Sequence, residues 1–281
     1  MWRGTDVAPR TGYYASLCTG GGGLDLALRL ALPDARCVLY VENEISAAGL
    51  LAARIADDAL DDAPIWSDLR TLDVEAWRGI VDGVVGGFPC PPYSVAGKQA
   101  GADDPRDLWP ECERFVREAG PRWAFFENVG GSLRDYHRRF GPDLTCAGYR
   151  HTASLFTAAE VGAPHQRERL FILAYRRREE PLGNPDKPRS QGRRESEREG
   201  QHELPAWPPG PTDTDAWAAI LRERPDLAPA VEPAVRGVAD GLADGLDLSR
   251  SEQLQILGNG VVPLVAAYAL RTLAADLGVE L

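Results

Sequence analysis

The feature that most limits the possible folds is a regular alternation of short apolar runs with amphipathic segments along the N-terminal part of the chain. An aromatic and apolar run at 11–18 ends in a glycine-rich turn, and leucines at helical spacing follow at 24–32. This order predicts a strand, a turn and a helix. Later segments repeat the pattern, with expected strands over 35–42, 80–88 and 121–129 and expected helices over 45–56 and 111–120. Strands that alternate with helices predict an α/β fold with a doubly wound parallel sheet.

The second half of the chain has a different texture. Two further strands are expected over 149–158 and 168–176, antiparallel at an edge of the sheet. Residues 177–215 carry almost no aliphatic side chains and cannot build a core. A short helix is expected over 217–227, and a longer amphipathic helix over 263–278 is expected to pack on the main sheet.

Composition excludes several classes of protein. The 281 residues are 44% hydrophobic, which is enough to bury a sizeable core. No run approaches the roughly 18 apolar residues of a membrane span, and the N-terminal segment MWRGTDVAPR lacks the apolar core of a signal peptide. The five cysteines are scattered without a CxxC pair, which argues against disulfides or a zinc site. We therefore expect free thiols, no metal, no membrane contact and a cytoplasmic location.

The charge distribution gives two opposing indications about nucleic acid. A net charge of −11 counts against such a partner. However, ten Lys and Arg residues stand against seven acidic ones between His165 and His202. Screening limits charge effects to about 10 Å, so this strip can still bind phosphate. Alternatively it is a solvated surface segment, which composition alone favours.

A turn of four glycines follows the first expected strand: Gly20, Gly21, Gly22 and Gly23. Its backbone amides can approach a polar ligand closely, but Asp25 stands where the dinucleotide pattern needs its last glycine. Glu42 lies 20 residues after Gly22, where such folds bind ribose hydroxyls. Asp68 could accept a hydrogen bond from an adenine amino group. Together these residues predict an adenosine ligand without a pyrophosphate. The alternative is a tight turn followed by two helix caps.

Cys90 follows the expected strand 80–88, and Glu127 lies near the end of the expected strand 121–129. The carboxyl ends of adjacent parallel strands face one crevice, so a thiol and a carboxyl would meet there. Pro89 and Pro91 make the loop around Cys90 stiff. A single cysteine is more often a small buried hydrophobe, and a lone glutamate is often a cap or an ion-pair partner. The rigid loop favours a functional thiol.

Two arginines and an asparagine complete the candidate site. Arg167 and Arg169 alternate before an expected strand and would share one face, where they could hold a polar planar group or lower a thiol pKa. Asn259, flanked by glycines, is expected to form a tight turn before the last helix.

The ordered series of motifs resembles the DNA (cytosine-5) methyltransferases, of the compact bacterial and phage type, from Ser16 to about Ala267. The motifs are SLCTGGGGLDLAL, Glu42, Asp68, GGFPCPPYS, FENV, GAPHQRERLF and LGNGVVP. The resemblance implies a Rossmann-like sheet that binds S-adenosylmethionine, with a small irregular recognition region. It divides the chain into a catalytic domain (1–176), a target-recognition region (177–248) and a returning C-terminal segment (249–281).

The resemblance also assigns roles. Cys90 adds to C6 of a flipped-out cytosine, so that C5 can accept a methyl group. Glu127 binds the exocyclic amine and protonates N3, which requires a raised pKa, Arg169 holds O2, and Arg167 orients the site. The implied cofactor contacts are Cys18, Gly20, Gly21, Gly22, Gly23, Glu42, Asp68, Leu69, Pro89 and Asn259. The implied substrate contacts are Ser94, near a phosphate, and Asn128. Double-stranded DNA and a separate restriction endonuclease are the implied partners of a monomer.

Three positions depart from the family pattern. Cys18 replaces the aromatic residue that stacks on adenine, and Pro91 and His165 each replace a glutamine. Two other readings remain open at this stage: a tRNA cytosine-5 methyltransferase of the same fold, and an inactive homologue that only binds DNA. A nucleotide-sugar or NAD-type enzyme fails on the glycine pattern.

Overall fold

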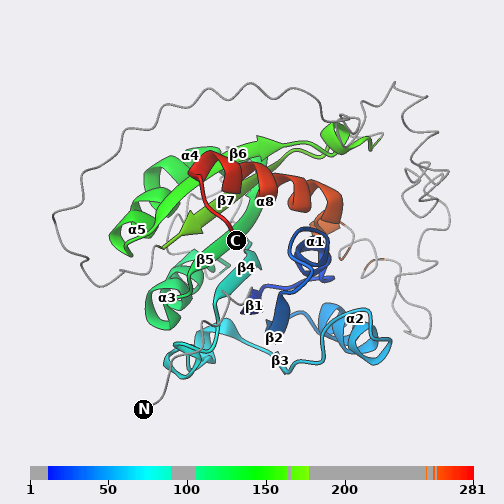
Figure 1. Ribbon diagram of the computed structural model, residues 1–281. Coiled ribbons are helices and arrows are strands. Elements are labelled where there is room, and N and C mark those ends of the chain that lie inside the picture. The colour runs from blue at the N-terminus through cyan, green and yellow to red at the C-terminus, as the bar shows by residue number, and fades with distance from the viewer. Residues whose placement is uncertain (1–11, 90–105, 164–165, 177–250, 252–255, 257) are drawn as a thin grey trace, which may run out of the picture.

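The computed structural model describes residues 12–89, 106–163, 166–176, 251, 256 and 258–281 (Figure 1). Four sequence predictions lie outside the described residues: the nucleophile Cys90, the phosphate contact Ser94, the helix over 217–227 and the recognition region 177–248. Within the described ranges the chain forms one seven-stranded mixed sheet with helices on both faces, as Figure 1 shows. The predicted α/β class is confirmed.

The parallel part of the sheet follows the predicted alternation. Its elements are β1 (Tyr13–Leu17), α1 (Gly23–Ala31), β2 (Arg36–Val41), α2 (Ile45–Ala56), β3 (Ile65–Trp66), β4 (Gly83–Gly87), α3 (Trp109–Ala119) and β5 (Trp123–Val129). Two short 3-10 turns, η1 (Leu69–Thr71) and η2 (Glu75–Trp77), connect β3 to β4. Sequence periodicity located these helices closely because each buries one apolar stripe against the sheet.

The far edge of the sheet is antiparallel. The strand order is β3-β2-β1-β4-β5-β7-β6, and β7 (Arg169–Tyr175) runs antiparallel to both β5 and β6 (Arg150–Phe156). The predicted antiparallel edge is therefore confirmed. The strand β6 is followed by the 3-10 turn η6 (Ala158–Val161), and the long C-terminal helix α8 (Pro263–Leu277) packs against α1, β6 and β7.

A helical stretch between β5 and β6 was not predicted from the sequence. It consists of η4 (Gly130–Ser132), α4 (Leu133–Asp135), the π-helical η5 (Tyr136–Phe140) and α5 (Gly141–Cys146). Leu133, Tyr136, Phe140 and Leu144 have helical spacing and contact the core, so the periodic signal was present.

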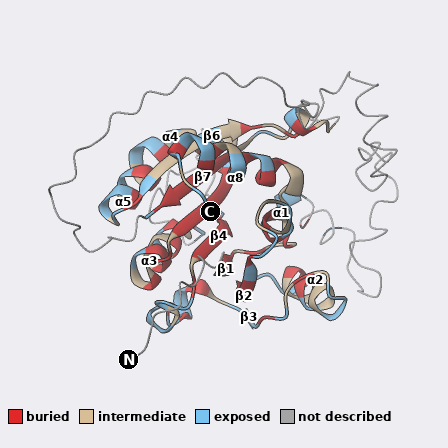
Figure 2. Cartoon of the chain, viewed as in Figure 1, coloured by how far each residue is buried: buried red, intermediate tan, exposed pale blue. Residues whose placement is uncertain are grey.

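Two apolar cores cover the two faces of the sheet, and Figure 2 shows the strands buried between them. One face packs against α1, α2 and α8, with Phe125 and Phe171 stacked at 5.6 Å between ring centroids. The other face packs against α3 and the stretch 133–146, where the ring centroids of Trp109 and Phe140 lie 4.6 Å apart. Truncating a buried aromatic such as Phe140 to alanine costs about 3–5 kcal/mol in comparable cores.

The strand order places the ligand crevice. Chain order reverses between β1 and β4, which lie side by side in the sheet. In open α/β sheets, ligands bind beyond the carboxyl ends of the strands at such a reversal. The glycine turn follows β1, and Pro89 follows β4, so both lie at this point. None of the helices that the structure describes is long and apolar enough to cross a membrane.

Candidate active site

The centre of the candidate site is an ion pair between Glu127 and Arg169. Glu127 lies in β5 and is only 6% exposed. Its Oε1 lies 3.0 Å from Arg169 Nε. The antiparallel direction of β7 explains the contact, because the first residue of β7 meets the carboxyl end of β5, where Val129 pairs with Arg169. The sheet itself therefore places this acid and this base together.

Burial raises the pKa of Glu127 to about 7, and the opposing effects of Arg169 and Arg167 do not cancel it. The raised pKa that the family resemblance implied is therefore present. A carboxyl that titrates near neutral pH is available as an acid and as a base at that pH. This is the property that a group protonating a ring nitrogen needs.

Asn128, the next residue, is held by hydrogen bonds to other groups of the protein. It is 3% exposed, and its Nδ2 donates to the Phe88 carbonyl at 3.0 Å. Its Oδ1 accepts from Val129 N at 2.8 Å and from the Ser132 hydroxyl at 2.9 Å. These bonds tie the loop after β4 to the end of β5. The Nδ2 group has a second hydrogen, and the role of Asn128 as a substrate contact stays a prediction.

Arg167 departs from its expected geometry. Its φ of 32° interrupts the extended alternation that would have placed it on one face with Arg169. Its Nη2 donates to the Gly258 carbonyl at 2.7 Å and to the Gly260 carbonyl. Burial, and then the nearby Arg169, lower the pKa of this guanidinium. Arg167 thus joins the site to the segment before α8.

That segment also supports the glycine turn. Gly22 has a φ of 77° at the N-terminus of α1, a conformation that favours glycine. A Cβ on Gly23 would lie 2.7 Å from the Val261 carbonyl oxygen, so the two backbones approach too closely for a side chain. The sequence explained these glycines by a ligand or by a tight turn. The structure shows that Gly23 is required for chain packing as well. Asn259 is exposed and lies between two residues that Arg167 contacts.

Glu42 closes the other side of the turn. Its Oε2 accepts from Gly20 N at 2.7 Å, and its Oε1 accepts from Glu44 N at 2.8 Å. A Cβ on Gly20 would meet no atom of the described residues within 4 Å, so there is open space above the turn in this part of the structure. A carboxylate offers about four lone-pair positions, so acceptor capacity remains for hydroxyl groups. The site therefore fits a ligand that carries hydroxyls, such as a ribose.

The turn that carries Asp68 is fixed from two sides. Asp68 Oδ1 accepts from Arg70 N at 3.0 Å, which caps η1. The Trp66 indole donates to the Asp68 carbonyl at 3.0 Å, and Arg114 on α3 donates to the Leu69 carbonyl at 2.7 Å. The Leu69 side chain is buried in the core, which leaves only its backbone for a ligand. The sequence reading missed Trp66 and Arg114, whose roles depend on tertiary contacts.

Cys18 points inward. It has a φ of 49° and is half-buried against the core that contains α3. A hydrogen bond with Cys18, followed by burial, raises the pKa of the Cys112 thiol well above its usual range. The small residue at position 18, in place of an aromatic one, therefore packs against α3.

A buried carboxyl that the sequence reading did not assign lies below the turn. Asp25 is 1% exposed and accepts from the Tyr14 hydroxyl at 3.1 Å and from the Ser16 hydroxyl at 3.0 Å. Burial raises its pKa to about 7 despite these two bonds. Asp25 fastens the first turn of α1 to β1 and so fixes the direction in which the helix leaves the glycine turn.

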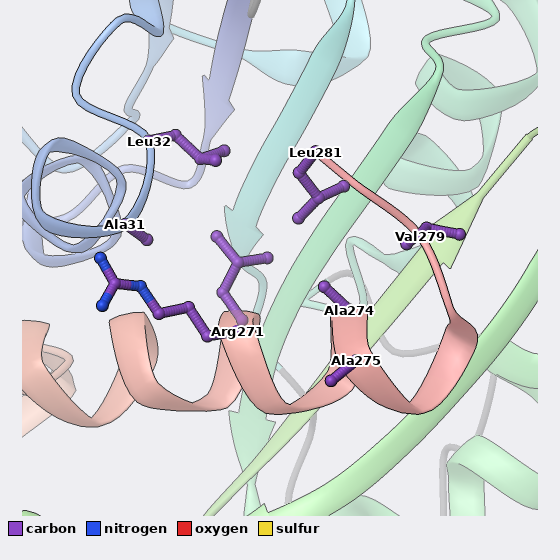
Figure 3. Close-up of a pocket in the computed structure, with 8 residues that line it drawn as sticks. Ala31, Leu32, Arg271, Ala274, Ala275, Val279 and Leu281 are labelled. Atoms are coloured by element: carbon purple, nitrogen blue, oxygen red, sulfur yellow. The ribbon is translucent and has the colours of Figure 1, made fainter. Parts of the chain in front are cut away.

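The most evident pocket lies elsewhere. Figure 3 shows it between α1 and α8, with a mainly apolar lining that includes Leu32, Leu270 and Leu281. Arg271 at its rim donates to the Leu30 carbonyl at 2.8 Å. The residues that line this pocket do not include any residue of the candidate site. Among the described residues there is also no group of three or more His, Cys, Asp or Glu placed to hold a metal ion.

Comparison with known families gives one match. A model of the C-5 cytosine-specific DNA methylases matches residues 13–220. The type II methyltransferase M.NgoMIV of Neisseria gonorrhoeae is 36% identical over 162 residues, which cover 56% of this chain and 50% of that protein. M.AquIA of Picosynechococcus sp. is 32% identical over 177 residues, which cover 57% and 71%. M.NaeI of Lentzea aerocolonigenes is 33% identical, with 56% and 38% covered. The chain thus spans about half the length of M.NgoMIV and less of M.NaeI.

Solved structures agree on the fold. The Dnmt2 methyltransferase of S. pombe superposes with a TM-score of 0.58 at 15% identity, covering 94% of this chain and 99% of that one. The methyltransferase EhMeth of Entamoeba histolytica gives a TM-score of 0.58 at 16% identity, covering 95% and 98%. At these identities the likeness concerns the fold alone.

Proposed function

Because the chain belongs to the family of C-5 cytosine-specific DNA methylases, we propose that it transfers a methyl group to C5 of cytosine in double-stranded DNA. The observation that carries the proposal is the buried Glu127–Arg169 pair at the carboxyl end of β5, with a carboxyl pKa of about 7. A carboxyl and a guanidinium side by side match the donors and acceptors on one edge of cytosine.

The proposed cofactor is S-adenosylmethionine. The open space above Gly20, the remaining lone pairs of Glu42 and the partly exposed Asp68 suit a ribose and an adenine amino group. Cys18, Pro89, Asn259 and the Leu69 backbone border this region in our assignment. When bound, the cofactor supplies an electrophilic methyl group on its sulfonium sulfur.

The chain's own residues then act on the base. The Cys90 thiolate adds to C6, and protonated Glu127 donates its proton to N3, so that ring electrons move towards C5. Arg169 donates to O2 of the ring and keeps Glu127 in place. After C5 carries the methyl group, a base removes the C5 proton, the Cys90 thiolate leaves C6 as the C5–C6 double bond forms again, and N3 returns its proton to Glu127. The target must leave the duplex stack for this to happen.

Arg167 has a positioning role in this proposal. It ties the residue before β7 to the Gly258 and Gly260 carbonyls, which keeps the cofactor side and the base side of the crevice in register. We also propose that residues 177–248 read the target sequence and that Ser94 contacts a phosphate. A cytoplasmic monomer that protects DNA from a separate restriction endonuclease fits the type II relatives.

The experiment is a covalent trap. Purified protein is incubated with the cofactor and mixed-sequence duplex DNA that contains 5-fluorocytosine. Fluorine cannot leave C5 as a cation, so the enzyme stalls as an adduct that survives denaturing electrophoresis. We expect a shifted band that is absent in Cys90→Ser. A band on fluorinated tRNA and none on DNA would contradict the DNA assignment, and no band on either would contradict the reaction.

A further inference from the structure

The helical stretch 133–146 begins directly at the candidate site. It follows β5, which carries Glu127, and Ser132 at its start donates to Asn128. Two of its arginines, Arg134 and Arg138, are exposed and stand four residues apart, which is about one helical turn. Two positive side chains therefore lie along one side of the helix next to the crevice.

These arginines differ from the others in the described part of the chain. Arg29, Arg54, Arg70, Arg114, Arg117, Arg139 and Arg169 form ion pairs. Arg36, Arg78, Arg122, Arg150, Arg167, Arg176 and Arg271 bond to carbonyls, to a hydroxyl or to an aromatic ring, and Arg106 also has a partner. Among the arginines that the structure describes, only Arg134 and Arg138 have no ion pair, hydrogen bond or ring contact.

The neighbouring Arg139 shows that the helix is held rigidly. It pairs with Asp107, whose side chain is 3% exposed and accepts from Trp109 N at 3.1 Å. Tyr136 and Phe140 are buried on the same stretch. The helix is thus fixed to the start of α3, and Arg134 and Arg138 project from a rigid support.

We propose that Arg134 and Arg138 bind backbone phosphates of duplex DNA beside the target cytosine. The inference rests on the proposed function and deepens it. Asp135 interacts electrostatically with both arginines but forms no ion pair with either in the described part of the chain, so they still supply local positive charge in a chain of net charge −11. One DNA strand carries a phosphate about every 3.4 Å of axis, so residues one turn apart can reach separate phosphates.

The test is the salt dependence of DNA binding by the full chain. Fluorescence anisotropy with a labelled mixed-sequence duplex measures the association constant from about 50 to 200 mM salt. Wild type is compared with Arg134→Gln/Arg138→Gln. The matched control is Arg36→Gln/Arg78→Gln, which removes the same charge from exposed positions at the amino end of β2 and just before β4, whereas the crevice lies at the carboxyl ends of the strands. Arg134→Lys/Arg138→Lys keeps the charge.

We expect the slope of log K against log salt to become less steep by about 1.8 in the glutamine variant, because each lost phosphate contact removes about 0.9. The control and the lysine variant should keep the wild-type slope. Equal slopes in wild type and the glutamine variant would overturn the inference and leave the proposed function standing. Wild type that binds no duplex DNA would overturn both. An equal loss in the control would show a general charge effect and refute the assigned surface.

Discussion

At the scale of single residues, Glu127 is the described side chain on which the proposed mechanism depends most. Its carboxyl is buried, touches Arg169 and titrates near neutral pH. Two forces act on it in opposite directions, since burial favours the neutral form and the guanidinium favours the charged form. The neutral form can still occur near pH 7, and that is the form that donates a proton.

The first prediction concerns the pH profile of this residue. Because the protonated carboxyl is the active form, kcat/KM should fall as the pH rises through about 7. Glu127→Gln should lower kcat by roughly 10²- to 10⁴-fold, and kcat/KM of this variant should no longer fall as the pH rises through 7. Methyl transfer measured between about pH 6 and 8.5 tests this, with cofactor binding by Glu127→Gln as the control. A profile that persists in the variant would assign the titration to another group.

The second prediction concerns Asp25. Its folded pKa of about 7 exceeds the ordinary value of 3.8, so the stability it contributes is full below about 3.8 and is lost as the pH rises through 7. Asp25→Asn keeps partners for Tyr14 and Ser16 but carries no charge. The variant should therefore gain unfolding free energy relative to wild type between pH 5 and 8, by at most about 3 kcal/mol, because about two pKa units lie between pH 5 and the folded pKa of about 7 and each corresponds to about 1.36 kcal/mol.

Urea unfolding at pH 5 and pH 8 measures this difference. Taking the difference between variant and wild type removes the contributions of other titrating groups. Parallel curves for the two proteins would mean that Asp25 is charged in the folded state at both pH values.

At the scale of elements, short turns are held by side chains from distant helices. The turn η1 presents Asp68, and Arg114 on α3 donates to both the Leu69 and the Leu72 carbonyls. The helix α3 follows the loop that contains Cys90 in the sequence. One guanidinium therefore connects the expected adenine side of the crevice to the helix after the nucleophile loop.

The third prediction is that Arg114→Met weakens cofactor binding more than it slows chemistry. Losing the two carbonyl contacts frees η1, so the KM for S-adenosylmethionine should rise about tenfold, which corresponds to about 1.4 kcal/mol. The value of kcat at saturating cofactor should change little. Arg117→Met on the exposed side of α3 is the matched control, because its ion-pair partners among the described residues are Glu113 and Glu118 on the same helix. A fall in kcat at unchanged KM would contradict the role.

The sequence predicted the elements better than the contacts between them. Alternating apolar patterns located β1, β2 and α1, because burial against one sheet sets a simple period. The helical stretch 133–146, which contains the π-helical η5, was not predicted although its apolar residues have helical spacing. The candidate site was predicted from residues at the ends of strands, because the topology of the sheet brings these ends together. The contacts of Asn128 and the backbone conformation of Arg167 were not predicted, because neither a buried hydrogen bond nor a positive φ can be read from the order of residues.

At the scale of the whole molecule, the last described segment completes the first. The helix α8 packs on α1, and Val261 fills the space beside Gly23. Arg167 links the same segment to the start of β7. Residues from the beginning, the middle and the end of the described chain thus meet at one edge of the sheet.

The fourth prediction tests this closure. In Gly23→Ala the new Cβ would lie 2.7 Å from the Val261 carbonyl oxygen, so the C-terminal segment must move. We expect a loss of about 1–3 kcal/mol in unfolding free energy, although alanine alone favours a helix. Gly21→Ala is the matched control, because its Cβ would lie 3.4 Å from a flexible side-chain atom of Ile256. Equal unfolding free energies for the two variants would show that the close approach is not rigid.

This closure also sets an order of events during protein synthesis. Ribosomes add about 5–20 residues per second, so Val261 is made some tens of seconds after Gly23. Late in that interval the nascent chain already contains Cys90, Glu127 and Arg169, but it still lacks the segment that supports the glycine turn and accepts hydrogen bonds from the Arg167 guanidinium. The glycine turn and the Arg167 guanidinium therefore gain this support only after the segment 258–261 has been made, and shorter nascent chains carry Glu127 and Arg169 without it.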